Sequence, residues 1–144
     1  MTTESPAARQ PLDPAALPET TIEFLTERHL ATLSTLRADL SVHVVPVGFT
    51  FDQETGLVRI ITRDGSVKVR NAERVLPGGI PTRGAVSQVD RGRWLTLEGP
   101  IRVSRVPEEI RDAENRYAAR YRQPQPNPAR VVLVIEVDRI LGRG

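Results

Sequence analysis

Hydrophobic positions recur along this chain of 144 residues with two different spacings. Apolar and β-branched residues follow the patterns of strands over 29–37, 41–52, 57–63, 85–90, 93–104 and 129–141. Helical spacing occurs instead over 20–28, where Thr20 to Glu23 has capping-box spacing, and over 107–122, which has acids in its first turn and arginines in its last. The pattern therefore predicts six strands and two main helices.

The connections between these strands are short. Turn residues at 38–40, 53–56 and 90–92 join successive strands as antiparallel neighbours, and Pro46 predicts a bulge within 41–52. A short helix is expected over 67–75 and a loop over 76–84. The last strand is apolar on both faces from Val131 to Ile135, which predicts a central position. Without an alternating strand–helix rhythm, the fold class is mainly β: a closed or nearly closed antiparallel barrel with a few helices.

Length and composition suit one domain. Residues 1–18 are rich in proline and polar residues and are expected to form a flexible leader, with the folded domain over 19–144. The chain has no cysteine, which excludes disulfides and thiolate metal sites. Its apolar runs are too short to cross a bilayer, and its first residues lack a signal-peptide pattern, so a cytoplasmic location is expected.

The charge pattern does not favour nucleic-acid binding. The net charge is only +2, although nineteen arginines and one lysine raise the isoelectric point to about 9.6. These cations are scattered among eighteen acids rather than gathered in a stripe. An arginine-rich nucleic-acid binder remains an alternative, and its affinity would depend steeply on salt.

Most motifs of standard catalytic sites are missing from the sequence. It has no P-loop, no GxGxxG after a strand, no HExxH and no GxSxG, and neither histidine has an acid at ligand spacing. We therefore predict no metal site and assign no catalytic side chain.

The segment 61–71 is the strongest candidate for a binding site. It leaves a strand through Gly65, presents the hydroxyl of Ser66 and opens a helix that carries Lys68, the only lysine of the chain. Backbone N–H groups at a helix start, with the hydroxyl of Thr62 and a compact ammonium, suit a phosphate. The alternative is an ordinary serine cap with cations facing solvent.

The order of these segments resembles the pyridoxamine 5′-phosphate oxidase-like split β-barrel superfamily. The resemblance covers about residues 20–142 and rests on HLATLSTLR, SVHVVPVGFTFD, LVRIITRDGSVKVRNAER, RWLTLEG and RVVLVIEVDRILG. Within this superfamily the chain most resembles the deazaflavin (coenzyme F420)-dependent reductases, a group that includes F420-dependent biliverdin reductases. The resemblance implies a six-stranded antiparallel split β-barrel of the FMN-binding type. It also implies a homodimer with a cofactor site at the subunit interface and a small-molecule substrate.

The same resemblance implies which residues hold the cofactor. The tricyclic ring would lie against 43–47, the phosphate would lie where 57–63 meets the following helix, and later strands of the second subunit would complete the pocket. The implied cofactor-binding residues are His43, Val44, Val45, Pro46, Val47, Ile61, Thr62, Ser66, Lys68, Arg70, Asn71, Gln88 and Trp94.

Departures from the superfamily pattern narrow the expected activity. Many members that bind FMN have arginine immediately before the helix lysine, whereas this chain has Val67, which favours F420 over FMN. The C-terminal tryptophan and arginine of the vitamin B6 oxidases are missing, so that activity is not expected. The leading hypothesis is an F420H2-dependent reductase that transfers hydride to a planar conjugated acceptor such as biliverdin. The alternatives are an FMN-binding oxidoreductase and a non-enzymatic flavin- or deazaflavin-binding protein.

Overall fold

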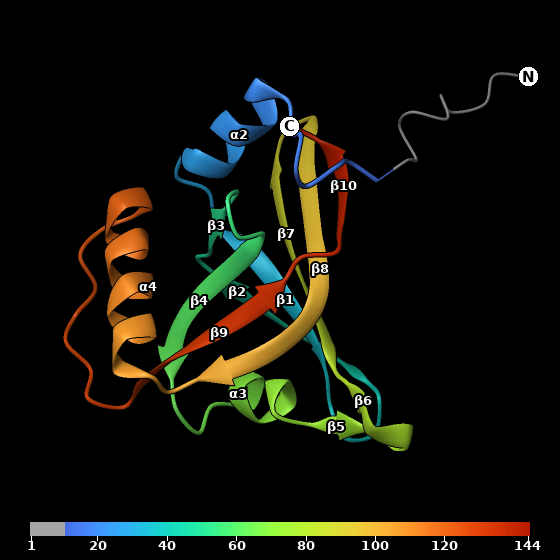
Figure 1. Cartoon of the computed structure of the whole chain (residues 1–144), viewed down its shortest axis with the longest axis vertical. Coiled ribbons are helices and arrows are strands. Elements are labelled where there is room, and N and C mark those ends of the chain that lie inside the picture. Colours follow the sequence, from blue (N-terminus) through green and yellow to red (C-terminus); the bar gives the residue numbers. More distant parts are fainter. Residues whose placement is uncertain (1–10) are drawn as a thin grey trace, which may run out of the picture.

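The fold is a twisted antiparallel sheet that curls into a split barrel, with one helix on its side and shorter helices at its two ends (Figure 1). The computed structural model describes residues 11–144. Its main strands are β1 (Ala31–Leu36), β2 (Val42–Val47), β3 (Thr50–Asp52), β4 (Leu57–Arg63), β7 (Arg83–Asp90), β8 (Arg93–Ser104), β9 (Arg130–Glu136) and β10 (Arg139–Arg143). The helices are α2 (Glu19–Thr26), α3 (Val67–Ala72) and α4 (Pro107–Arg120). The mainly β split barrel expected from the sequence is thus confirmed.

The strands pair in the order β2–β1–β7–β8–β9–β4–β3, and β10 also pairs with β8. The long strand β8 belongs to both halves of the barrel, because Arg93–Pro100 pairs with β7 whereas Ile101–Ser104 pairs with β9. The curvature of β8 is visible in Figure 1. At Gly99 a Cβ atom would stand 1.9 Å from the carbonyl oxygen of Glu136, so only glycine fits at this crossing.

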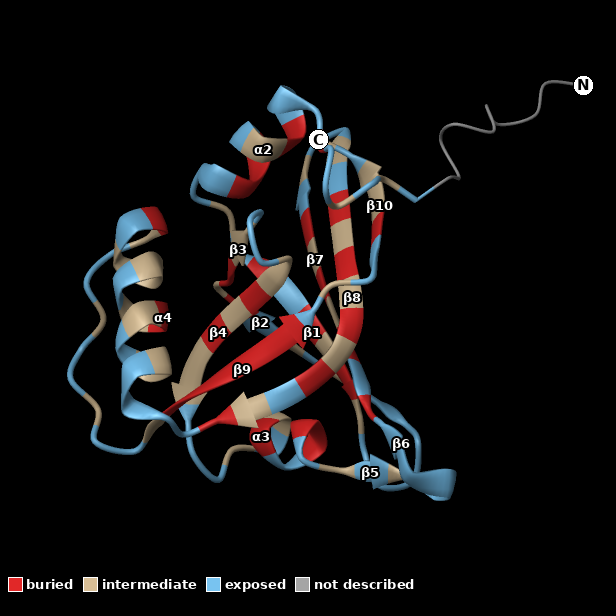
Figure 2. Cartoon of the chain, in the orientation of Figure 1, coloured by how far each residue is buried: buried red, intermediate tan, exposed pale blue. Residues whose placement is uncertain are grey.

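The barrel interior is filled by alternate residues of the strands, whereas β9 is buried on both faces (Figure 2). Leu133 and Ile135 of β9 point into the main core, and Val132 and Val134 pack beneath α4 against Ala113. Helix α4 therefore covers the outer face of β9, which confirms the central position predicted for this strand.

Several predicted boundaries were wrong. The segment 41–52 forms two strands rather than one bulged strand, because β2 pairs with β1 whereas β3 pairs with β4 at the other end of the strand order. At Gly48 between them, a Cβ atom would lie only 3.1 Å from the ring of Tyr117. Likewise 129–141 divides into β9 and β10, and the predicted loop 76–84 contains part of a small hairpin of β5 (Val75–Leu76) and β6 (Ile80–Pro81).

The first helix also starts differently from the prediction. Its N-cap is Pro18, without a side-chain cap, so the capping box at Thr20 does not form. The carbonyl of Pro18 instead accepts hydrogen bonds from the N–H groups of Thr21 and Ile22. These bonds begin the helical pattern at Pro18, and no hydroxyl caps the first turn.

Part of the predicted leader packs against the barrel. Leu17 is buried in the core, and the N–H of Leu12 donates to the carbonyl of Ile140 over 2.7 Å. Residues 1–10 of the leader lie outside the described part of the chain. Among the helices that the structure describes, none is long and apolar enough to cross a membrane.

Candidate functional site

A cavity of about 340 Å³ opens between the end of β2, the second half of β4, α3 and the segment that follows α4. It lies at the split of the barrel, because β2 is at one end of the strand order and β3 at the other. Strand β3 pairs only with Leu57–Arg59, so the following residues of β4 have β9 on one side and the cavity on the other. The lining residues are Pro46, Val47, Gly48, Ile60, Ile61, Thr62, Lys68, Tyr117, Arg122, Pro124, Gln125 and Arg130.

The cavity has an apolar wall and a cationic wall. Pro46, Val47 and Ile61 form the apolar side, against which a planar ring can pack. Lys68, Arg122 and Arg130 supply the positive charge, and none of the lining residues is an acid. Such a site attracts an anion that also carries an apolar body.

Two of these three cations have no acidic partner in the described part of the chain. Arg130 is neutralised, because its Nη1 lies 2.6 Å from Glu114 and its Nη2 donates to the carbonyl of Gln125 over 2.9 Å. Neither Lys68 nor Arg122 forms an ion pair with a described carboxylate. Burial, together with repulsion from Arg63, lowers the pKa of Lys68 from its usual 10.5. An anion bound beside this ammonium would offset both the cost of burying its charge and the repulsion from Arg63.

The turn before α3 leaves a hydroxyl unsatisfied. Gly65 takes the left-handed conformation (φ 80°) that lets the chain turn from β4 into the helix. Ser66 is the N-cap residue of α3, yet its side chain makes no cap hydrogen bond, and its Oγ is buried without a partner among the described residues. A phosphate oxygen would satisfy such a donor, so the residues present fit a phosphate-bearing group.

His43 lies close enough to Lys68 for the ammonium to affect the pKa of its imidazole. Burial lowers the pKa of His43 below 6.5, and the cations Arg37 and Lys68 lower it further. Its Nδ1 is buried without a described partner. At neutral pH this imidazole is therefore uncharged, and it can donate or accept one hydrogen bond at that atom.

Asn71 and Arg70 shape the helix rather than the cavity. The buried Nδ2 of Asn71 donates to Oγ1 of Thr35 over 3.1 Å, which fixes α3 on β1. Nη1 of Arg70 donates to the carbonyl of Gly65 over 3.1 Å. Both side chains thus hold the turn and the helix that carry Ser66 and Lys68.

Five of the thirteen residues expected at the cofactor line this cavity, namely Pro46, Val47, Ile61, Thr62 and Lys68. Six further expected residues lie nearby without lining the cavity. Three are on β2, namely His43, Val44 and Val45, and three are at the start of α3 or on it, namely Ser66, Arg70 and Asn71. Gln88 is completely buried inside its own subunit, and Trp94 is 38% exposed at the start of β8.

Reasoning from the sequence did not find the opposite wall. This wall is formed by Tyr117 of α4, by Arg122 just after that helix, and by Pro124 and Gln125 of the QPQPNP segment. In the sequence, QPQPNP indicated only that a helix ends there. The two tyrosines Tyr117 and Tyr121 are one helical turn apart, which could have indicated a packed helix face. Their rings pack over Gly48, but nothing local in the sequence indicates that contact.

Comparisons with known proteins identify the family of this chain. Residues 17–144 match the family described as pyridoxamine 5′-phosphate oxidase. An F420H2-dependent biliverdin reductase of Mycobacterium tuberculosis (strain CDC 1551 / Oshkosh) is 52% identical over 126 residues, which cover 88% of each chain.

Two solved structures share the fold. A conserved hypothetical protein of Mycobacterium tuberculosis has a TM-score of 0.72 at 19% identity, over 93% of this chain and 89% of the other. An F420 reductase has a TM-score of 0.65 at 22% identity, over 86% of this chain and 98% of the other. The chain belongs to the pyridoxamine 5′-phosphate oxidase family.

Proposed function

We propose that this protein is an F420H2-dependent reductase that transfers hydride from reduced deazaflavin to a planar conjugated acceptor, with biliverdin as the leading candidate. The observation that carries the proposal is the acid-free cavity at the barrel split, where Lys68 has no described counter-ion beside an apolar wall. The 52% identity to an F420H2-dependent biliverdin reductase supports the choice of cofactor and acceptor.

The residues divide into those that hold the phosphate and those that hold the ring. We assign Lys68 and Thr62, which line the cavity, to a phosphate group, together with the unpartnered hydroxyl of Ser66 at the start of α3. Pro46, Val47 and Ile61 provide the surface for the ring. The bound deazaflavin supplies the hydride, and the protein supplies position and a water-poor wall.

The remaining cation of the cavity suggests how the acceptor is held. Arg122 has no ion pair with a described carboxylate, and its planar guanidinium suits a carboxylate in bidentate fashion. We therefore assign Arg122 to the carboxylates of a tetrapyrrole acceptor. No acidic side chain lines the cavity, so the proton that accompanies the hydride is assigned to solvent.

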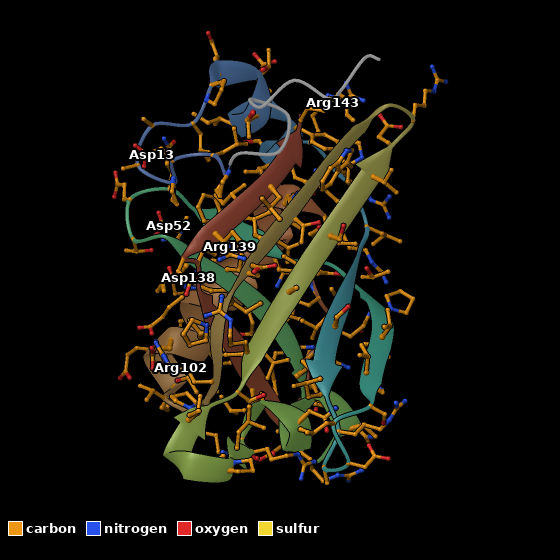
Figure 3. All side chains as sticks on the ribbon, turned by 90° about the vertical axis from the view of Figure 1, so that its right-hand side faces the viewer. Asp13, Asp52, Arg102, Asp138, Arg139 and Arg143 are labelled. Carbon is orange, nitrogen blue, oxygen red and sulfur yellow. The ribbon has the colours of Figure 1, made fainter. Side chains whose placement is uncertain are left out.

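We further propose that the protein is a homodimer and that the second subunit completes the pocket. The outer face of β2, β1, β7 and β8 is free of helices in the described chain (Figure 3). It exposes Val42 and Val44, and Val44 lies beside Ser34, which in turn lies beside Ala85. This surface with apolar and small residues is adjacent to the cavity through Pro46, and we include Trp94 among the residues that face the partner.

The decisive experiment is equilibrium binding of oxidised F420 and of FMN to the purified protein, side by side, followed by turnover of biliverdin with F420H2. Preference for F420 and oxidation of F420H2 by biliverdin are the expected results. Preference for FMN would instead favour an FMN-dependent oxidoreductase, and binding without turnover would favour a cofactor carrier. A cytoplasmic location and the lack of nucleic-acid binding remain part of the proposal.

A further inference from the structure

Arg105 connects two acidic residues that lie on either side of helix α3. It follows directly after β8, and its guanidinium donates four hydrogen bonds. Nε and Nη2 donate to the two carboxylate oxygens of Asp64 over 3.0 and 2.9 Å. Nη1 and Nη2 donate to those of Glu73 over 2.9 and 3.1 Å. One side chain therefore binds both carboxylates in bidentate geometry.

The two carboxylates mark the ends of the segment that carries the proposed phosphate ligands. Asp64 comes directly after β4, and its Oδ1 also accepts the N–H of Gly65 over 2.9 Å. Glu73 is the C-cap residue of α3. Between them lie Ser66 and Lys68. Arg105 thus holds the segment 64–73 at its start and at its end.

Helix α3 depends on such external contacts for its position. It has only six residues, and a helix this short is not stable by itself in water. Asp64 is fixed through its N–H to the carbonyl of Ala129 over 2.8 Å, and Asn71 is fixed to Thr35. Arg105 adds a third attachment, from a different strand, and relates the two ends of the segment to each other.

Arg105 is also the cation that pairs with both acids of this segment. Without it, the two carboxylates that flank Ser66 and Lys68 in the sequence would have uncompensated charge, and the segment would lose the contact that joins its ends.

We propose that Arg105 is a positioning residue of the phosphate site: by binding Asp64 and Glu73 together, it sets the segment 64–73 so that Ser66 and Lys68 meet the phosphate of the cofactor. The inference rests on the proposed function, because the ligand of Lys68 is the phosphate of F420. Arg105 itself does not line the cavity that holds Lys68.

The test compares Arg105→Gln with a matched control, Arg116→Gln. Arg116 of α4 also bridges two carboxylates, Asp112 over 2.9 Å and Asp52 over 3.3 Å, and its side chain is 37% exposed against 48% for Arg105. We expect Arg105→Gln to weaken binding of oxidised F420 about tenfold, whereas Arg116→Gln should leave it within about twofold. Equal affinities of the two variants would overturn the proposal.

Hydrogen exchange tests the same inference without the cofactor. In the unliganded protein, Arg105→Gln should speed amide exchange over 64–73, while exchange in β7 and β8 stays as in the wild type. Unchanged exchange over 64–73 would overturn the role of Arg105. If the wild type itself failed to bind F420, the proposed function would fail, and the exchange result would still decide whether Arg105 orders this segment.

Arg105→Lys separates geometry from charge, because lysine keeps the charge but lacks the planar fork. We expect this variant to recover less than half of the lost binding free energy. Wild-type affinity in Arg105→Lys would show that charge alone suffices and would overturn the positioning role. The thermal midpoint, measured in parallel, should change little in all three variants because exposed ion pairs contribute little to stability.

Discussion

Arg120 of α4 donates a hydrogen bond from Nη2 to Oε1 of Gln88 on β7, over 2.8 Å, at a place where both side chains are buried. Gln88 in turn donates from Nε2 to the carbonyl of Phe24 over 3.0 Å. The guanidinium also donates to the carbonyls of Glu27 and Phe49. This network joins α2, the start of β3, α4 and β7, so it secures the helix whose end forms one wall of the cavity.

Arg120→Ala should therefore destabilise the protein strongly. The substitution leaves the buried amide oxygen of Gln88 without a donor and removes the Arg120 hydrogen bonds to the carbonyls of Phe49 and Glu27, and we expect a loss of about 3 kcal/mol in the free energy of unfolding. Urea denaturation measures this loss. Arg139→Ala, which removes an arginine that is 56% exposed beside Glu98, should cost less than about 0.5 kcal/mol. Similar losses in both variants would contradict the structural role of Arg120.

Gln88→Ala decides between two roles for this residue. The sequence predicted that Gln88 contacts the cofactor across the dimer, whereas its amide is occupied by Phe24 and Arg120 in the folded chain. If the role is structural, the variant should lose about 2 kcal/mol of stability and still bind F420 within about twofold of the wild type. A clear loss of F420 affinity in the folded variant would instead support contact with the cofactor.

Lys68→Met should weaken binding of F420 more than any other single change in the cavity. A charge-assisted contact to phosphate contributes about 1.5–3 kcal/mol, so we expect a loss of affinity of about 10- to 100-fold. Fluorescence titration with oxidised F420 measures it. Lys68→Arg keeps the charge and should lose less. Wild-type affinity in Lys68→Met would show that the phosphate lies elsewhere.

The sequence was informative where a pattern is local or repeats along the chain. The strand 57–63 was predicted with its observed bounds, and the run from Val131 to Ile135 correctly indicated a central strand. The division of 41–52 was missed, because its two parts pair with different strands, β2 with β1 and β3 with β4. Which strand each part pairs with is settled by the whole barrel, which no local pattern records.

The same limit applies to the candidate site. The expectation of a binding site at 61–71 follows from adjacent residues, and Ile61, Thr62 and Lys68 do line the cavity, whereas the wall formed by Arg122 and Gln125 depends on where α4 ends in space. The buried amide of Asn71 is directed to Thr35 on a different strand, a contact that sequence position alone does not indicate.

His43 should make stability depend on pH just below neutrality. Burial and the cations Arg37 and Lys68 lower its pKa from 6.5, so the unfolded state takes up a proton at a higher pH than the folded state does. Above about pH 7 both states are neutral and His43 contributes nothing; as the pH falls through about 6.5, the unfolded state is favoured. His43→Gln cannot titrate, so its stability should decline less in this range.

Urea denaturation of both proteins at about pH 7.5 and about pH 5.5 measures this difference. The lowered pKa values of Asp64 and Asp138 place their titration below this window, so they do not obscure it. Equal losses of stability in the wild type and in His43→Gln would contradict the prediction.

The proposed dimer can be tested at Val44, which is 53% exposed on the outer face of β2. Val44→Glu would place a charge within the apolar contact, and burying an unpaired carboxylate is strongly unfavourable. The variant should therefore sediment as a monomer at micromolar concentration, where the wild type should be a dimer. Val106→Glu is the control, because Val106 is 47% exposed at the start of α4, on another part of the surface, and this variant should remain dimeric.

Cofactor binding by a second variant, Val42→Glu, tests whether the site is composite. Val42 is 55% exposed on the same face of β2 and is not among the expected cofactor residues, whereas Pro46 belongs both to the cavity wall and to the outer row of that strand. If the second subunit closes the pocket, a monomeric Val42→Glu protein that keeps its fold should bind F420 at least about tenfold more weakly, although Lys68 is unchanged. Undiminished affinity in the monomer would place the whole cofactor site within one chain. A wild type that sediments as a monomer would refute the dimer and the composite site together.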